Sequence, residues 1–222
     1  YDQFYSREIL PTYAHAWLLS GIYSPDYQDV LNDGITEDDR GNAIKFNYTK
    51  KGNYSWRNPV NPLLAMGNTQ LAATHSKGVE YIDNDDKAII NYGEREEWYN
   101  HSIESKTMIA FFYTSPRKDA KPMNRDGLIN SQGSKEKLDY IRVYSKAEIS
   151  AISKQFPNLT KVQLLNKATP IKTINFEYDY LLCKNTPNHE IPNSGKLTLK
   201  QINFINGTNS TQYSYKFNYG NL

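Results

Sequence analysis

The sequence predicts a mainly β protein in which antiparallel, bulged β-hairpins lie side by side, together with one short helix. Three observations lead to this fold class. Residues 212–219 alternate strictly between polar and aromatic side chains, as in a strand with one buried face. The strand pattern of this stretch recurs upstream. Tyrosine is abundant, at 18 residues against 8 phenylalanines, which suits a partly covered sheet because the ring can be buried while the hydroxyl meets water.

The last hairpin, residues 196–219, predicts a bulge. Its outgoing strand places Leu199 and Ile202 three residues apart, a spacing that would put them on opposite faces unless one extra residue bulges out. A bulge at Lys200–Gln201 closes the register, with a short polar loop at residues 206–209. The expected pairs are Phe204 with Tyr213, Ile202 with Tyr215, Leu199 with Phe217 and Leu197 with Tyr219.

Two short patterns alternate along the chain, L-x-x-I in an outgoing strand and F-x-Y in the returning strand. Four copies indicate an internal repeat of hairpins with insertions of variable length, not a solenoid of fixed period. The copies are Leu19/Ile22 with Phe46/Tyr48, Asn100/Ile103 (Asn100 in place of leucine) with Phe111/Tyr113, Leu138/Ile141 with Phe176/Tyr178, and Leu199/Ile202 with Phe217/Tyr219.

These stretches resemble a known family. The hairpin GKLTLKQINFIN…YSYKFNYG resembles the units of RHS/YD-repeat proteins and the related SpvB-like regions of bacterial insecticidal toxin complexes. The stretches AHAWLLSGIYSPDYQDVLNDGITEDDRG, WYNHSIESKTMIAFFYTSPRKDA and PIKTINFEYDYLLC resemble large surface or secreted proteins of Bacteroidetes-type bacteria that carry RHS-like repeats. The resemblance extends over roughly residues 14–219 and consists of degenerate β-repeat signals.

The resemblance implies a non-enzymatic structural module of a large exported bacterial protein, part of a shell or stalk around a separate effector. It implies an extracellular or cell-surface location, with neighbouring repeats of the parent chain or other secretion and toxin components as partners. The alternative is a carbohydrate- or surface-binding β module. An enzyme is the third reading, because every strong signal in the chain describes sheet building.

Composition excludes several classes of partner. The net charge of +2 with interspersed signs argues against nucleic acid and anionic membranes.

The single Cys183 excludes an internal disulfide framework, and no run approaches the ~18 apolar residues of a transmembrane helix. The chain has neither a starting Met nor a secretory leader at Tyr1, so we expect a piece of a longer protein.

The N-terminal strands are assigned from the repeat. Residues 13–23 are apolar enough for a buried strand, although the first half of this stretch would equally suit a short helix. Residues 44–48 form the first returning strand. Residues 47–73 are expected to be a polar surface insertion, because their two X-Pro steps disfavour helix and ladder pairing. A short strand is expected at residues 88–92.

The loop of residues 26–41 has the spacing of a calcium loop, with carboxylates at positions one, five and nine and a glycine at position six. Positions three and twelve, Leu31 and Arg40, depart from that pattern. The alternative is an acidic turn whose Asn-Asp-Gly supplies left-handed backbone. A second acidic cluster, residues 83–86, is either a solvated turn or part of the same metal shell. The predicted calcium ligands are Asp29, Asp33 and Glu37, with Asp38 or Asp39.

Aromatic residues in the insertion suggest a ligand site. Tyr48, Tyr54, Trp56 and Arg57 would form a sugar-stacking platform if the loop exposed them together. The other reading is that Trp56 anchors the loop on the sheet, and we favour it because large aromatic side chains are mostly buried.

Titratable residues further along give a weaker indication of catalysis. On an alternating strand, Glu94, Glu96 and Glu104 share one face, while Glu97 and His101 share the other. No spacing there matches a known metal or acid–base motif, so an exposed strand is expected. His189, beside Glu190 in the loop of residues 186–195, is expected to be solvated.

The remaining elements follow in order. Residues 106–114 form a nearly continuous apolar run, expected to be a strand covered on both faces or at a junction. Residues 119–137 form a loop and the best candidate for an internal boundary. Strands are expected at residues 138–144 and 174–182.

One helix is predicted, at residues 146–156. Ser145 is its cap with Glu148 three residues on, and an apolar stripe of Ile149, Ile152 and Phe156 ends at Pro157.

Overall fold

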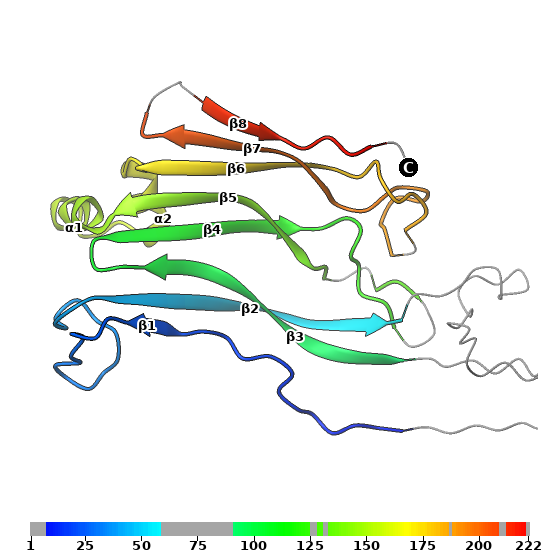
Figure 1. Cartoon of the computed structure of the whole chain (residues 1–222), viewed down its shortest axis with the longest axis horizontal. Helices are drawn as coiled ribbons and strands as arrows, with labels where there is room; N and C mark the ends of the chain where they lie inside the picture. The colour runs from blue at the N-terminus through cyan, green and yellow to red at the C-terminus, as the bar shows by residue number, and fades with distance from the viewer. Residues whose placement is uncertain are drawn as a thin grey trace, which may run out of the picture.

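The computed structural model describes residues 8–58, 91–124, 128–130, 133–186, 188–208 and 212–220. Its strands form one eight-stranded antiparallel sheet in chain order, from β1 at one edge to β8 at the other (Figure 1). The prediction of a mainly β protein built from side-by-side hairpins is confirmed. The strands are β1 Gly21–Tyr23, β2 Ala43–Arg57, β3 Tyr92–Glu104, β4 Met108–Pro116, β5 Glu136–Ser145, β6 Lys172–Asp179, β7 Thr198–Asn206 and β8 Gln212–Lys216.

Bulges occur where one hairpin meets the next. Where β6 pairs with β7, the register steps from Gln201 to Leu199 and leaves Lys200 as the extra residue. A bulge is therefore present at the predicted position, but it lies in the contact with β6, and the ladder of β7 with β8 ends before the expected pairs of Leu199 with Phe217 and Leu197 with Tyr219. The pairing of β2 with β3 leaves out His101 in the same way, and that of β4 with β5 leaves out Asp139. Each extra residue lies inside an L-x-x-I pattern, so the three-residue step returns to the same face.

The two sequence patterns meet across the hairpin boundaries. Between β2 and β3, Phe46 lies opposite Ile103 and Tyr48 opposite Asn100. Between β6 and β7, Phe176 lies opposite Ile202 and Tyr178 opposite Leu199. Between β4 and β5 the residues opposite Ile141 and Leu138 are Phe112 and Thr114, so Phe111 and Tyr113 lie one residue away from the position that the F-x-Y pattern occupies in the other two contacts.

Tyrosines of the F-x-Y pattern bond back to their own hairpin. The hydroxyls of Tyr48, Tyr178 and Tyr219 donate to the backbone carbonyls of Leu19, Leu138 and Leu199 at 2.9, 2.8 and 2.8 Å. A bulge disrupts the ladder locally, and a carbonyl beside it needs another donor. Tyr178 and Tyr219 supply that donor beside the bulges at Asp139 and Lys200, and Tyr48 makes the corresponding bond just before β1.

The two faces of the sheet differ in character. Opposed residues share a face and neighbours along a strand alternate, so the pairing assigns each residue to a face. We call the face that carries Ile109 and Tyr144 the helix face, and the opposite one the open face. Every buried strand residue lies on the helix face: Tyr54, Ser102, Ile109, Phe111, Tyr144, Thr198 and Asn203.

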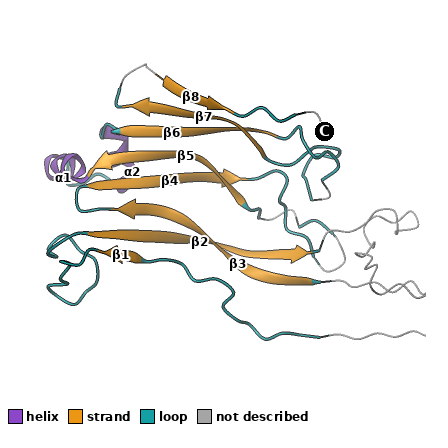
Figure 2. Cartoon of the chain, viewed as in Figure 1, coloured by secondary structure: helices purple, strands orange, loops and turns teal. Residues whose placement is uncertain are grey.

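Two short helices cover one end of the helix face, beside β4 and β5 (Figure 2). Helix α1 (Lys146–Gln155) begins at Ser145, whose side chain accepts from the Glu148 N–H, as predicted. Helix α2 (Lys161–Lys167) was not predicted, although Thr160 and Gln163 form a complete capping box that the sequence displays. Side chains of both helices pack on a core cluster of Ile109, Phe111, Tyr144 and Ala168.

Outside the apolar cluster, several buried and half-buried side chains on the helix face make polar contacts. Asn203 is 2% exposed. Its amide donates to Glu177 at 2.5 Å and its carbonyl accepts from Ser214 at 2.6 Å. Asn47 donates to Ser102 and Glu104 at 3.1 and 2.7 Å. Hydrogen bonds therefore take the place of an apolar core over much of this face, as buried polar groups require.

Several predicted boundaries need correction. β1 begins only at Gly21, and the preceding residues 13–20 are irregular. The strand at residues 108–116 buries side chains on the helix face only. Of the two expected alternatives, cover on both faces or a position at a junction, the first was therefore wrong. β7 and β8 contain the expected pairs of Phe204 with Tyr213 and Ile202 with Tyr215. Their ladder ends at Gln201–Lys216, and Phe217 then donates its N–H to the Lys200 carbonyl at 2.8 Å.

Candidate functional site

The acidic loop between β1 and β2 is built around the carboxylate of Asp39. This side chain accepts hydrogen bonds from the Tyr27 hydroxyl at 2.7 Å and from the N–H groups of Thr36 and Val30 at 2.8 and 3.1 Å. The Thr36 N–H and then the Tyr27 hydroxyl hold the pKa of Asp39 below its ordinary value. Burial, and then the bond to Asp39, raise the pKa of Tyr27. Asp39 is therefore an ionised acceptor that shapes the loop.

Three of the predicted calcium ligands come together in this loop. Asp29, Asp33 and Asp39 each place a carboxylate oxygen within 4.8 Å of the others. Asp29 also accepts from the N–H groups of Asp33 and Gly34 at 3.2 and 3.0 Å. Asn32 and Gly34 have φ angles of 56° and 90°, so the left-handed turn of the alternative reading is present as well.

The other two predicted ligands lie apart from this group. The Glu37 side chain is 84% exposed and lies 3.9 Å from the Lys146 ammonium, and Asp38 is exposed. The structure thus narrows the candidate metal ligands to Asp29, Asp33 and Asp39. Calcium binding stays a prediction. The second acidic cluster, residues 83–86, lies outside the described residues.

Lysine side chains attach the same loop to the sheet. Lys45 donates to the Ile35 carbonyl at 3.1 Å, and Lys106 donates to the carbonyls of Asp39 and Gly41 at 3.5 and 3.3 Å. Lys146 pairs with Glu104 at 3.1 Å. These groups line a cavity of about 110 Å³ beside the loop. Ammonium groups from β2, α1 and the turn before β4 thus bind loop carbonyls and carboxylates.

The residues of the predicted sugar platform do not form one surface. Tyr48 lies in β2, as the expected strand at residues 44–48 requires. Tyr54, Trp56 and Arg57 also lie in β2, so their assignment to a surface loop was wrong. The insertion from residue 59 onward lies outside the described residues. The partners of these four residues in β3 place Tyr48 and Arg57 on the open face and Tyr54 and Trp56 on the helix face. Tyr54 is buried, with its hydroxyl donating to the Lys121 carbonyl at 3.2 Å.

The glutamates of β3 are divided between the two faces of the sheet differently from the prediction. Because His101 is the extra residue of a bulge, Glu104 moves to the helix face with Glu97, while Glu94 and Glu96 lie on the open face. Glu96 pairs with Lys50 at 2.5 Å and Glu97 with Arg95 at 2.7 Å. Burial, and then the charge of Lys161, lower the pKa of His101. These carboxylates hold neighbouring strands and side chains together, as the exposed-strand interpretation expects.

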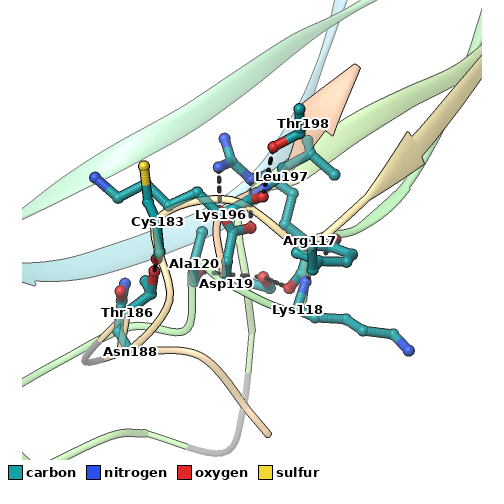
Figure 3. Close-up of polar contacts among 12 residues, drawn as sticks. Arg117, Lys118, Asp119, Ala120, Cys183, Thr186, Asn188, Lys196, Leu197 and Thr198 are labelled. Atoms are coloured by element: carbon teal, nitrogen blue, oxygen red, sulfur yellow. Dashed lines mark hydrogen bonds and ion pairs between the residues drawn. The ribbon is translucent and has the colours of Figure 1, made fainter. Parts of the chain in front are cut away.

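A buried ion pair, missed in the sequence, ties the loop after β4 to the strand β7. Arg117 donates to both carboxylate oxygens of Asp119, at 3.0 and 2.7 Å, and the Leu197 N–H donates to the same carboxylate at 2.9 Å (Figure 3). Asp119 is 4% exposed. The only signal in the sequence was two opposite charges two residues apart, shortly after the end of a predicted strand.

The same cluster includes a buried histidine. His189 is 5% exposed, so the expectation that it is solvated was wrong. Its Nδ1 accepts from the Ile191 N–H at 2.8 Å, and its ring meets Tyr180 edge-on. Adjacent backbone bonds run from Glu190 to Lys118 and from Lys121 to Asn188. The start of the loop at residues 119–137 is thereby fastened to the loop of residues 186–195.

Apolar side chains also line up in rows across the open face of the sheet. One row of side chains crosses it from β4 to β8 through Phe112, Ile141, Ile174, Phe204 and Tyr213. Another crosses from β2 to β5 through Phe46, Ile103, Ala110 and Val143. None of these side chains is buried in the described structure, and Tyr213 is 62% exposed.

The chain matches no protein-family model, no curated protein and no solved structure. None of the helices in the described part of the chain is long and apolar enough to span a membrane.

Proposed function

We propose that this chain is a non-enzymatic structural module whose sheet forms part of the wall of a larger exported protein assembly. The open face carries this proposal. An apolar face of a sheet is normally packed against a second layer, and large exposed apolar patches on soluble proteins usually mark interaction sites. Here the layer that would cover the open face is absent from the described residues, so another part of the assembly supplies it.

The chemistry of the described side chains supports a structural role. The tyrosine hydroxyls bond to carbonyls beside two of the bulges and just before β1, and lysines bind the acidic loop. The buried ion pair joins two loops. In each case the charged or polar group is used to set the path of the backbone. The resemblance to RHS-like repeats points to the same role, a β scaffold that surrounds a separate effector.

Covalent footprinting tests this proposal. The isolated chain and the intact protein from its source would be labelled with a photoactivated carbene, followed by mass spectrometry of the peptides. We expect Phe112, Ile141 and Ile174 to be labelled in the isolated chain and protected in the intact protein. Phe111 and Tyr144, which are buried on the helix face, serve as internal controls with low labelling in both. Equal labelling of the open face in both samples would overturn the proposal.

A further inference from the structure

The two edge strands of the described sheet are of the two kinds that pair where one of its hairpins meets the next: β1 is an outgoing strand and β8 a returning strand. The sheet begins with the outgoing strand β1, which contains Ile22 and follows directly after Leu19 and Ser20, and ends with the returning strand β8, which leads into Phe217 and Tyr219. Inside the sheet, a returning strand of one hairpin always pairs with the outgoing strand of the next. The outer edges of β1 and β8 are the unpaired members of such contacts in the described sheet.

The last hairpin repeats the hydrogen bonds of the first. In the first, the Phe46 N–H donates to the Ser20 carbonyl at 2.9 Å and the Tyr48 hydroxyl to the Leu19 carbonyl at 2.9 Å. In the last, the Phe217 N–H donates to the Lys200 carbonyl at 2.8 Å and the Tyr219 hydroxyl to the Leu199 carbonyl at 2.8 Å. Ser20 follows Leu19 as Lys200 follows Leu199. Phe217 and Tyr219 are therefore placed in their hairpin as Phe46 and Tyr48 are in theirs.

The first returning strand, β2, shows which kind of strand pairs with the outer edge of a returning strand. Phe46 lies opposite Ile103 of the next outgoing strand and Tyr48 opposite Asn100, with one extra residue between. The β6–β7 contact has the same register. By this geometry, the edge at Phe217 and Tyr219 accepts an antiparallel L-x-x-I strand.

We propose that a second copy of this chain supplies that strand through its β1 edge. Phe217 of one copy then lies opposite Ile22 of the other, Tyr219 opposite Leu19, and Ser20 is the bulged residue. Both surfaces are accessible: Leu19 is 53% exposed, Ile22 48% and Tyr219 45%. Unpaired edges readily add strands, and a head-to-tail contact that does not close builds open chains of copies. This goes beyond the proposed function, because it identifies the partner and its register.

Cysteine cross-linking tests the register. In a Cys183→Ser background, which removes the exposed native thiol, one copy carries Lys216→Cys and the other Tyr23→Cys. The register sets these positions directly opposite each other, as Lys45 and Glu104 are in the β2–β3 contact, at a separation that a disulfide spans. We expect the mixed pair to form a disulfide heterodimer on mild oxidation. The matched pair of Lys216→Cys with Ile22→Cys should form at least ~10-fold less, because a one-residue slip puts the thiols on opposite faces.

Sedimentation velocity supplies the second measurement. The wild-type chain should form larger species as its concentration rises. Because the Phe217 N–H points toward β7, the next N–H along the strand, that of Asn218, points outward. Asn218→Pro removes this donor and should weaken association at least ~10-fold, while Asn218→Ala should leave it unchanged. A chain that stays monomeric at all concentrations, or equal disulfide yields from the two pairs, would overturn the proposal. The footprinting result decides the proposed function independently.

Discussion

The hydroxyl groups of three tyrosines act where the pairing of the strands is interrupted. Each donates to the carbonyl of a leucine that precedes or adjoins the irregular step of its hairpin. Phenylalanine would fill the same space on the open face and leave that carbonyl without this donor. The abundance of tyrosine over phenylalanine in this chain thus has a specific cause at these positions.

Replacing Tyr178 by phenylalanine tests this role. The change removes the bond to the Leu138 carbonyl and should lower the free energy of unfolding by about 1 kcal/mol, the usual net value of such a bond. Tyr215→Phe is the matched control. Its side chain is 66% exposed on the same face, and we expect a change within about 0.5 kcal/mol. Urea denaturation followed by tryptophan fluorescence measures both, and equal effects of the two changes would contradict the role.

Asp119 is a second residue on which the fold depends, through its carboxylate. Asp119→Asn removes the charge that pairs with Arg117, whose side chain is 29% exposed. Removing one member of a buried pair is strongly destabilising, so we expect a loss of about 3 kcal/mol by urea denaturation at pH 7. Lys50→Met, which removes one member of an exposed pair, should cost less than about 1 kcal/mol. A smaller effect at Asp119 than at Lys50 would show that the pair is dispensable.

The same residue should make stability depend on pH in the acid range. Burial alone would raise the pKa of Asp119, but its hydrogen bonds from Arg117 and the Leu197 N–H outweigh burial and lower it. A carboxyl with a lowered pKa in the folded chain stabilises the fold above its unfolded-state pKa of about 3.9, and this stabilisation is lost as the pH falls through the folded value. Unfolding free energy should therefore decline below about pH 4, and less steeply in Asp119→Asn.

At the scale of single elements, the bulges determine which side chains face which way. Deleting Lys200 should turn Leu199 and the residues before it to the opposite face, because side chains alternate along a strand. We expect the deletion to lower the free energy of unfolding by more than about 2 kcal/mol, since it also breaks the bond from Tyr219. Lys200→Ala keeps the extra residue and should remain within about 1 kcal/mol of wild type. Chemical denaturation of both variants distinguishes the register effect from loss of the side chain.

The acidic loop is the element whose ligand can be tested directly. We expect calcium to raise the melting temperature and a chelator to lower it, because a ligand bound only by the folded state stabilises that state. Asp33→Asn should abolish most of the rise and leave the calcium-free melting temperature nearly unchanged, since this side chain makes only a 3.5 Å contact with Thr36. Asp39→Asn should lower the melting temperature with or without calcium, because it weakens the bonds from Tyr27, Val30 and Thr36. A wild-type melting temperature that responds to neither reagent would identify the loop as an acidic turn.

Over the whole molecule, stability should decrease from the middle of the sheet toward its edges. The apolar cluster under the helices lies on β4 and β5, whereas β1 and β8 each have one neighbouring strand. Segments with fewer buried contacts open more readily, and their amides exchange faster. Hydrogen exchange should therefore be slowest in β4 and β5 and fastest in β1 and β8, with intermediate rates in β3 and β6. Uniform protection across all eight strands would contradict this gradient.

The order of the strands and the position of the bulges follow from local patterns. Period-two alternation, the L-x-x-I step and the Ser145 cap each depend on residues close in sequence. The structure has strands over the predicted range 138–144 and over residues 174–179 of the predicted range 174–182, a bulge at Lys200 and helix α1 where these patterns indicate. The capping box of Thr160 and Gln163 is also visible in the sequence and predicts α2. These features could be predicted because backbone sterics and capping bonds act over a few residues.

The tertiary structure alone decided which face of the sheet is buried and which residues far apart in the chain meet. The sequence by itself determined that each hairpin has an apolar face; it did not determine that this face would be the open one, with the buried residues on the other. Nor did it predict that Asp119 would meet Leu197, that His189 would be buried, or that the bulge at His101 would move Glu104 toward Lys146. Such contacts join residues tens of positions apart in the chain. They form only when burial and hydrogen bonding across strands outweigh the entropy of ordering the loops between them.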